Sequence, residues 1–105
     1  MIELNGKERK HLRGLAHHLD PRVHIGKHGL TEAVVEEVDG QLDEHELIKI
    51  KFVDHKREKK EIADELARRL HAAVAGTVGH LAILYRPAPR AERRRIELPR
   101  RGDAA

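Results

Sequence analysis

Two glycines enclose a lysine and a histidine within Ile25–Glu32, and this G-x-x-G pattern holds the most informative chemistry of the chain. Glycine permits positive φ and carries no Cβ, so a foreign backbone can approach such a loop closely. Lys27 and His28 place a fixed cation and a titratable donor at the tip, which suits a polyanion. The pattern therefore predicts a phosphate-binding loop over Gly26–Gly29.

The residue after the loop strengthens this prediction. Thr31 is of a type that favours a helix N-cap. The helix that it begins would direct unpaired N–H groups and the positive end of its dipole at the loop, where a phosphate could be held. In KH domains a G-x-x-G loop clamps the RNA backbone in this way. Most strand-to-helix turns with two glycines bind nothing, so the rest of the chain must support an RNA ligand.

The composition restricts the kind of domain. The chain has 105 residues, enough for one domain with one modest core that buries about two-thirds of the unfolded surface. Charged residues make up 37% and aromatic residues 2%, so Leu, Ile, Val and Ala must build the core. Phe52 and Tyr85 cannot form the stacking platform of an RRM or of a single-strand-binding OB sheet.

The sequence lacks the residues that common enzyme mechanisms need. It contains no cysteine and no serine, and its only hydroxyl groups belong to Thr31, Thr77 and Tyr85. No nucleophile is paired with a base, and the loop lacks the G-K-[ST] ending of a P-loop. We therefore expect no catalysis, no small-molecule substrate and no cofactor.

Nine histidines suggest the hypothesis of a metal site. His24 and His28 span a strand end and a loop, and His17 and His18 point in different directions on a helix. Because native sites need several convergent ligands, we expect no metal. Protonation of His17 and His28 is expected instead to add to RNA affinity.

The chain has no run of apolar residues as long as a membrane span. Its N-terminus also lacks the apolar region of a signal peptide. We therefore expect a cytoplasmic protein without a membrane partner.

Charge is distributed unevenly along the chain. The net charge is +3, with a sequence pI near 9.4. Thr31–Ile48 holds seven acids and no lysine or arginine, whereas Arg86–Arg101 holds seven arginines and two glutamates. A polyanion is therefore expected to meet one face only. The acidic helix leaves a second hypothesis open, an adaptor that contacts a basic ribosomal protein, and charge alone does not exclude DNA.

Turn residues and periodicity predict a first helix before the loop. Asn5 and Glu8 have the form of a capping box that begins this helix near Gly6, and Asp20-Pro21 ends it. Its buried stripe is expected to comprise Leu12, Leu15, Ala16 and Leu19. Its basic stripe comprises Lys10, Arg13 and His17, with Lys7 and Arg9 in the first turn.

The elements around the loop follow from the next patterns. A short strand over Arg22–Ile25 enters the loop, and a helix runs from Thr31 to about His45. Leu47–Val53 alternates as a half-buried strand. Lys49 and Lys51 fall on its polar side, which is expected to be wet or covered by the tail.

The second half of the chain supplies a third helix and two more strands. The buried stripe of this helix comprises Ile62, Ala63, Leu66, Ala67 and Leu70. Strands are expected over Val74–Val78, interrupted by Gly76, and over Leu81–Tyr85, which is apolar enough to be buried on both faces. The order α-β-α-β-α-β-β predicts an α/β (α+β) two-layer sandwich, with helices packed on a mixed four-stranded sheet.

The prolines and arginines after Pro87 do not favour a packed element. We therefore predict one domain over residues 1–87 and an arginine-rich C-terminal tail over residues 88–105. Arg95–Leu98 could add one edge strand, and Arg100–Ala105 is expected to be disordered.

Four motifs resemble, in order, those of the CRM domain (chloroplast RNA splicing and ribosome maturation) in its stand-alone bacterial YhbY-type form. They are Leu12–His17 in the first helix, Ile25–Glu32 at the loop, His45–Lys51 in the second strand, and Gly79-His80 followed by Leu84–Pro87. The resemblance covers most of the chain, although the tail is longer and more basic than the family leads us to expect.

The resemblance implies a non-enzymatic RNA-binding module with a fold similar to the C-terminal domain of a bacterial translation initiation factor. It implies association with ribosomal RNA in precursors of the large ribosomal subunit, and ribosomal proteins are a second class of partner considered. The RNA-contacting loop of the family falls on Gly26–Gly29. Residues and resemblance together predict that RNA is bound by Gly26, Lys27, His28, Gly29, Thr31, Lys7, Lys10, Arg13, His17, Arg22 and Arg86.

Overall fold

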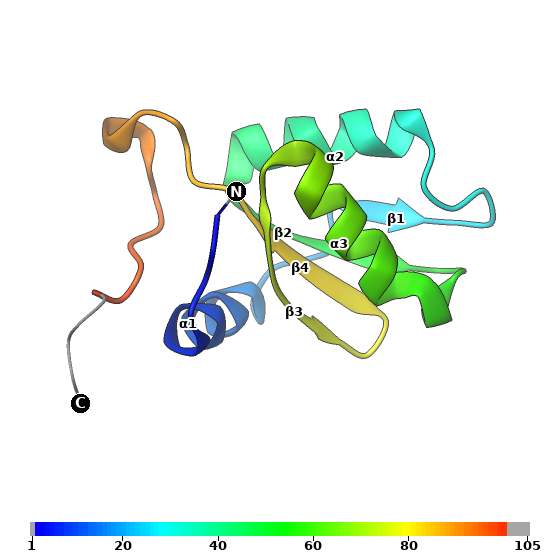
Figure 1. Cartoon of the computed structure of the whole chain (residues 1–105), viewed down its shortest axis with the longest axis horizontal. Coiled ribbons are helices and arrows are strands. Elements are labelled where there is room, and N and C mark those ends of the chain that lie inside the picture. The colour runs from blue at the N-terminus through cyan, green and yellow to red at the C-terminus, as the bar shows by residue number, and fades with distance from the viewer. Residues whose placement is uncertain (1, 101–105) are drawn as a thin grey trace.

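The computed structural model of the chain describes residues 2–100, and its elements follow the predicted order (Figure 1). The helices are α1 (Gly6–Ala16), α2 (Glu32–His45) and α3 (Lys59–Leu70). The strands are β1 (Val23–Ile25), β2 (Leu47–Phe52), β3 (Ala73–Val78) and β4 (Leu81–Tyr85). Two 3-10 turns are η1 (Lys56–Glu58) and η2 (Ala91–Arg93).

The four strands form one mixed sheet in the order β1-β2-β4-β3. β1 runs parallel to β2, with Val23 opposite Ile50. β4 runs antiparallel to both β2 and β3, and the register to β3 shifts between Val74 and Gly76. The predicted α+β class, with three helices and a mixed four-stranded sheet, is therefore confirmed.

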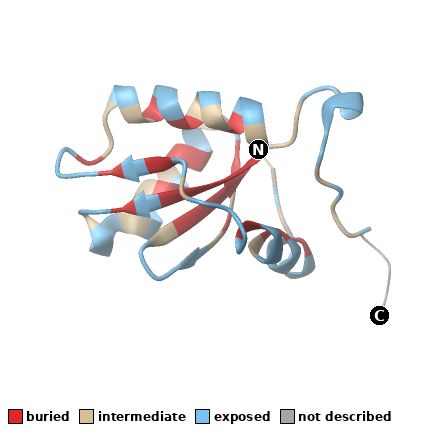
Figure 2. Ribbon diagram, turned by 180° about the vertical axis from the view of Figure 1, so that it is seen from behind, coloured by how far each residue is buried: buried red, intermediate tan, exposed pale blue. Residues whose placement is uncertain are grey.

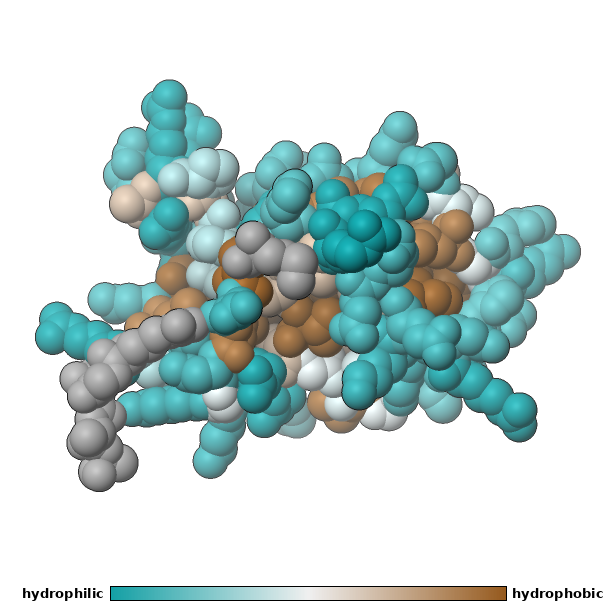
Figure 3. All heavy atoms as spheres, in the orientation of Figure 1, coloured by the Kyte–Doolittle hydropathy of each residue, from teal (hydrophilic) through white to brown (hydrophobic). Residues whose placement is uncertain are grey.

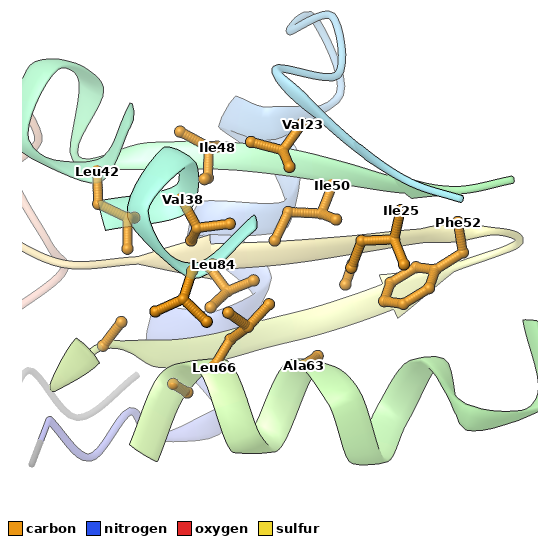
Figure 4. Packing of buried hydrophobic residues seen from close by; sticks show 14 residues of the cluster. Val23, Ile25, Val38, Leu42, Ile48, Ile50, Phe52, Ala63, Leu66 and Leu84 are labelled. Atoms are coloured by element: carbon orange, nitrogen blue, oxygen red, sulfur yellow. The ribbon is translucent and has the colours of Figure 1, made fainter. Parts of the chain in front are cut away.

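Helices α2 and α3 cover one side of the sheet, which we call the closed face (Figure 4). Its strand residues include Ile48, Ile50 and Phe52, all fully buried. The helices contribute the predicted stripes, including Val38 and Leu42 from α2 and Ala63, Leu66 and Ala67 from α3. Among residues 2–100, fourteen of the 21 buried apolar residues belong to this cluster, so the closed face supplies most of the core.

Helix α1 lies on the opposite side of the sheet, which refines the two-layer prediction (Figure 2). Its predicted capping box is confirmed, because Asn5 Oδ1 accepts from Glu8 N and Glu8 Oε1 accepts from Asn5 N. Leu12 and Ala16 are buried in a second apolar cluster with Leu47, Ala75, Ile83 and Tyr85. The helix thus covers the end of the sheet near Tyr85.

Part of this second side remains uncovered, and we call it the open face. Strand register places His24 beside Lys51, Lys51 beside Leu81, and Leu81 beside Val78. His24, Lys51 and Val78 are exposed. The open face therefore consists of these four residues, at the end of the sheet where the chain enters the glycine loop.

Lys49 departs from the expectation for the polar side of β2. It is only 9% exposed, because α1 covers it, and its Nζ donates a hydrogen bond to His17 O at 3.4 Å. Lys51, two residues further along, is exposed. The polar side of β2 is thus divided into a covered half and an exposed half.

The prediction that Leu15 and Leu19 are buried is wrong. They are 41% and 36% exposed. The helix ends at Ala16, earlier than predicted, and Leu15 lies at the edge of the face that Leu12 and Ala16 turn to the sheet. Leu15 and Leu19 instead line a shallow hollow together with Leu47 and Ile96.

Hydrogen bonds and apolar contacts attach the tail to the domain as far as Leu98. No strand forms over Arg95–Leu98, because the N–H groups of Arg95 and Ile96 bond to the carboxylate of Glu46 and not to a sheet edge. Residues 101–105, most of the segment expected to be disordered, lie outside the described residues. The division of the chain at residue 87 stays a prediction.

Candidate nucleic-acid interface

The glycine loop is a closed turn between β1 and α2, in which the two glycines serve different purposes. Gly29 N donates a hydrogen bond to Gly26 O at 3.0 Å, which closes the turn. Gly29 has φ +66, in the left-handed region that glycine adopts without strain. A Cβ added at Gly26 would meet nothing within 4 Å. Gly29 is therefore required by the fold, whereas Gly26 leaves space that a ligand can use.

The segment between β2 and α3 holds the loop by its backbone. Val53 N and Asp54 N donate to Ile25 O at 2.9 and 3.2 Å. His55 Nε2 lies 2.8 Å from Lys27 O, and since a carbonyl only accepts, Nε2 must carry the proton. The same ring lies against Gly29, where an added Cβ would be 3.4 Å from Nε2. The loop is thus fixed without using its own side chains.

Lys27 and His28 project from this fixed loop and are exposed. Neither side chain has a hydrogen bond or ion pair with another residue between 2 and 100. The two acids beside the loop are engaged elsewhere: Asp54 Oδ1 accepts from His55 N at 2.7 Å, and Glu32 pairs with Arg69 at 2.8 Å. The positive charge at the tip is therefore available to a ligand.

The start of α2 lies directly after the loop. Thr31 Oγ1 accepts a hydrogen bond from Val34 N at 3.2 Å, so the predicted N-cap is confirmed. The first N–H groups of the helix have no intrahelical acceptor, and they lie at the positive end of the dipole. The loop and the first turn of α2 together present hydrogen-bond donors that suit an anion.

Further basic side chains surround the open face. Arg22 is exposed at the start of β1, where its N–H bonds to Lys49 O. In α1, Lys10 and His17 stand three residues before and four residues after Arg13, so all three share one side of the helix. Lys10 and His17 are exposed, as is Lys7 in the first turn. The predicted stripe of α1 is therefore present as a surface feature.

Arg13 itself is used to attach α1 to the sheet. Its Nη1 donates to Ala75 O at 3.0 Å, and its Cδ would lie 2.7 Å from a Cβ added at Gly76. Gly76 has φ +157 at the register shift of β3, and only glycine leaves room there for the arginine stem. Arg13 thus borders the open face, but its guanidinium already has a partner.

Arg86 does not join the loop surface, in contrast to its predicted role. It follows β4, at the end of the sheet away from the loop, and its side chain is 18% exposed. Its guanidinium bonds to Asp39 Oδ1 at 2.7 Å, Asp43 Oδ1 at 2.8 Å and Leu70 O at 3.0 Å. Arg86 therefore joins the C-terminal halves of α2 and α3.

Sequence reasoning missed three residues of this region. Lys51 and His24 alternate with buried neighbours, a signal that could have placed them beside the loop. His55 has no comparable signal, because its contact with Lys27 spans 28 residues. Proximity in the folded chain alone brings His55 to the loop.

Residues 2–100 contain neither a candidate metal site nor a candidate membrane span. These residues contain no group of three or more His, Cys, Asp or Glu side chains that could hold a metal ion. None of their helices is both long enough and apolar enough to cross a membrane.

Known proteins resemble this chain along most of its length. A protein named RNA-binding protein from Haemophilus influenzae is 44% identical over 102 residues, which cover 96% of this chain and 100% of that protein. The candidate RNA-binding protein YqeI of Bacillus subtilis is 31% identical, over 91% of this chain and 99% of YqeI.

The fold is also found in a solved structure. The solution structure of a Staphylococcus aureus protein, described as a candidate RNA-binding protein, matches with a TM-score of 0.79 and 34% identity. The match covers 92% of this chain and 100% of that chain. The model of the CRS1 / YhbY (CRM) domain matches residues 4–86, from the segment before α1 to the end of β4. The chain therefore belongs to the CRS1/YhbY (CRM) domain family, as its sequence motifs predicted.

Proposed function

We propose that this protein binds RNA, and that the loop Gly26–Gly29 contacts the phosphate backbone. One observation carries the proposal: the loop is fixed by its backbone and by His55, while Lys27 and His28 project from it without a partner among the described residues. A preorganised loop with free charge loses little conformational entropy on binding a polyanion. The relatives named as RNA-binding proteins support RNA as that polyanion.

The open face extends the contact beyond the loop. Phosphate would lie at Gly26–Gly29 and the start of α2, with Lys27 as a point charge and His28 as a hydrogen-bond donor. Lys51, His24 and Arg22 continue the basic surface towards Lys10 and His17 of α1. Because no aromatic platform accompanies these cations, we expect structured RNA to be bound by shape more than by base sequence.

The specific target proposed is ribosomal RNA in precursors of the large ribosomal subunit, during ribosome assembly in the cytoplasm. The CRM motifs around the loop support this target by resemblance. Ribosomal proteins are a second class of partner, which the acidic α2 could contact. Three acids of α2 are already paired within the fold, Glu32 with Arg69 and both Asp39 and Asp43 with Arg86, which weakens α2 as the main interaction surface.

Binding to fragments of precursor large-subunit RNA and to duplex DNA, at two salt concentrations, tests the proposal. We expect the wild type to prefer RNA, with each neutralised phosphate contributing about 0.7–0.9 to the log-log salt slope. The Lys27→Glu, His28→Glu double variant should lose this preference, whereas a Glu36→Gln, Glu37→Gln variant should retain it. Equal, weak binding to RNA and DNA would reject the proposal.

A second variant tests the loop without changing its charge. Gly26→Ala adds a methyl group in open space, so the melting temperature should not change. An RNA backbone in contact with the loop would meet that methyl group, and we expect the affinity to fall about tenfold, or about 1.4 kcal/mol. Unchanged affinity would show that RNA does not approach Gly26.

A further inference from the structure

One buried carboxylate fixes the chain after β4. Glu46 lies at the C-terminal end of α2, is 2% exposed and has φ +63. Its Oε2 accepts from Ala88 N at 2.7 Å, and its Oε1 accepts from Arg95 N at 2.7 Å and Ile96 N at 3.3 Å. Hydrogen bonds from N–H groups to a carboxylate are stronger than those between neutral groups. Glu46 therefore holds both ends of the segment Ala88–Ile96.

Apolar contacts attach the same part of the chain a second time. Ile96 and Leu98 are partly buried and pack against the cluster beneath α1, which includes Leu47 and Tyr85. These contacts are independent of the carboxylate, because they remove apolar surface from water. The tail up to Leu98 thus has a defined position on the domain.

We propose that the tail over Ala88–Arg100, which is attached to the domain as far as Leu98, is a second contact surface for the RNA backbone; the inference rests on the proposed function. The tail carries five arginines and two glutamates. Arg94 bonds to the carbonyls of Ala88 and Pro89. Four arginines are exposed and have no hydrogen bond or ion pair from their side chains to another residue in 2–100: Arg90, Arg93, Arg95 and Arg100. Figure 3 shows mostly hydrophilic side chains projecting from the tail at the upper left.

The state of these arginines differs from that of Arg86. Arg86 has two carboxylate partners and joins α2 to α3. The tail instead presents guanidinium groups that match phosphate oxygens in geometry and charge. Ordering by Glu46 removes most of the backbone freedom that a free tail would lose on binding. Unpaired arginine side chains on an attached backbone segment are therefore suited to a polyanion.

Two acids determine the side from which RNA can approach. Asp43 and Glu44 line the hollow between the tail and α2, together with Arg93 and Arg95. Phosphates entering this hollow would be repelled by the carboxylates. Because Arg93 and Arg95 line this hollow and are exposed, we place the RNA backbone against their guanidinium groups at the mouth of the hollow, and not inside it.

The tail and the glycine loop lie at opposite ends of the molecule (Figure 1). The longest dimension of the protein is 43 Å. At the B-DNA rise of about 3.4 Å per step this span corresponds to about 13 base pairs, and the shorter rise of A-form RNA requires slightly more. An RNA much shorter than this can reach only one of the two surfaces. Because the proposed function makes the loop the main contact, short RNA should bind there, and the tail should contribute only when a long RNA reaches both surfaces.

The test compares two double variants on duplex RNAs of about 6 and about 24 base pairs, lengths on either side of that span. Arg93→Gln, Arg95→Gln removes two tail cations, and the control Lys60→Gln, Arg68→Gln removes two exposed cations of α3. On the long RNA we expect the tail variant to lower the log-log salt slope by about 1.4–1.8, and on the short RNA to change nothing. A change on the long RNA no larger than that of the control overturns the proposal.

Glu46→Gln tests the role of order, because it retains every arginine. The glutamine amide replaces one acceptor oxygen with an N–H donor, which would face a backbone N–H group of the tail. Amide exchange at Arg95 and Ile96 should therefore accelerate, and affinity for the long RNA should fall. Accelerated exchange with wild-type affinity would overturn the role of Glu46.

The loop variant Lys27→Glu, His28→Glu separates the two proposals. If the tail variant alone loses affinity, the proposed function of the loop fails and the tail surface stands. If the loop variant alone loses affinity, the tail surface is rejected.

Discussion

The two sides of the sheet differ in what covers them and in what they expose. Ile50 and Lys51 are adjacent in β2, yet Ile50 is fully buried on the closed face and Lys51 is exposed on the open face. Two helices of 14 and 12 residues cover the closed face, whereas α1, with 11 residues, covers only part of the other side. The uncovered part is where basic side chains remain available to a ligand.

Whether a basic side chain is available to a ligand thus depends on what surrounds it in the fold and not on its residue type. Arg86 and Lys27 are both basic, but Arg86 is enclosed by the acids of α2 and Lys27 has no partner among the described residues. Arg13 is an intermediate case, since it borders the open face while bonding to Ala75 O. Stability and RNA binding should therefore respond separately to substitutions on the two sides of the sheet.

The largest effect is expected for Ile50→Ala on the closed face. Removing a fully buried side chain leaves a cavity, and the free energy of unfolding should fall by about 2–5 kcal/mol. Urea denaturation measures this loss. RNA affinity of the folded protein should not change, and a loss of affinity at intact stability would contradict the separation of the two sides.

Arg86→Ala should also affect stability alone. It leaves Leu70 O and the Asp39 and Asp43 carboxylates without their donor, at a cost of about 1–2 kcal/mol, because both carboxylates are partly exposed to water. Thermal unfolding and RNA titration of the same sample test this. Lower RNA affinity with unchanged stability would instead support the RNA contact that the sequence predicted for Arg86.

Lys51→Glu should have the opposite signature. The side chain is exposed, so the free energy of unfolding should change by less than about 0.5 kcal/mol. Reversing a charge beside His24 should lower RNA affinity about tenfold, or about 1.4 kcal/mol. The matched control is Lys60→Glu on α3, and equal losses for both variants would show that only net charge matters.

His55→Ala tests the support of the loop. Loss of one hydrogen bond to Lys27 O should lower RNA affinity about fivefold, or about 1 kcal/mol. His55→Gln keeps an N–H donor at the same left-handed position, φ +54, so it should recover most of the affinity. Titration of RNA by fluorescence anisotropy compares the two, and equal affinities would argue against a positioning role for His55.

The smallest effect concerns Tyr85, which is buried beneath α1. Burial, together with the charge of Glu46, raises the pKa of Tyr85 above its ordinary value of 10.0. At pH values above about 10, the unfolded chain releases the phenolic proton while the folded protein retains it, so the free energy of unfolding falls as pH rises. Below it the group has no effect. Tyr85→Phe should weaken this alkaline loss in urea denaturation between about pH 9 and about pH 11, and identical pH profiles would contradict it.

Local signals in the sequence determined much of the fold and the place of the loop. The Asn5–Glu8 capping box and the Thr31 N-cap formed as predicted, and β2 formed as a strand, although α1 covers Lys49 on its polar side. Each depends on residues within a few positions of one another, so the energetic preference is present before distant parts of the chain meet. The order of elements and the mixed sheet follow from these preferences.

Only the tertiary structure decided which basic residues are free and which are used. Arg13 bonds across 62 residues, Arg86 across 47 and His55 across 28. Glu46 likewise orders the tail from 42–50 residues away. Sequence patterns of short range give a side chain its type and its side of a helix or strand. Whether an acid or a carbonyl then engages it depends on long-range packing, which the pattern of one element does not contain.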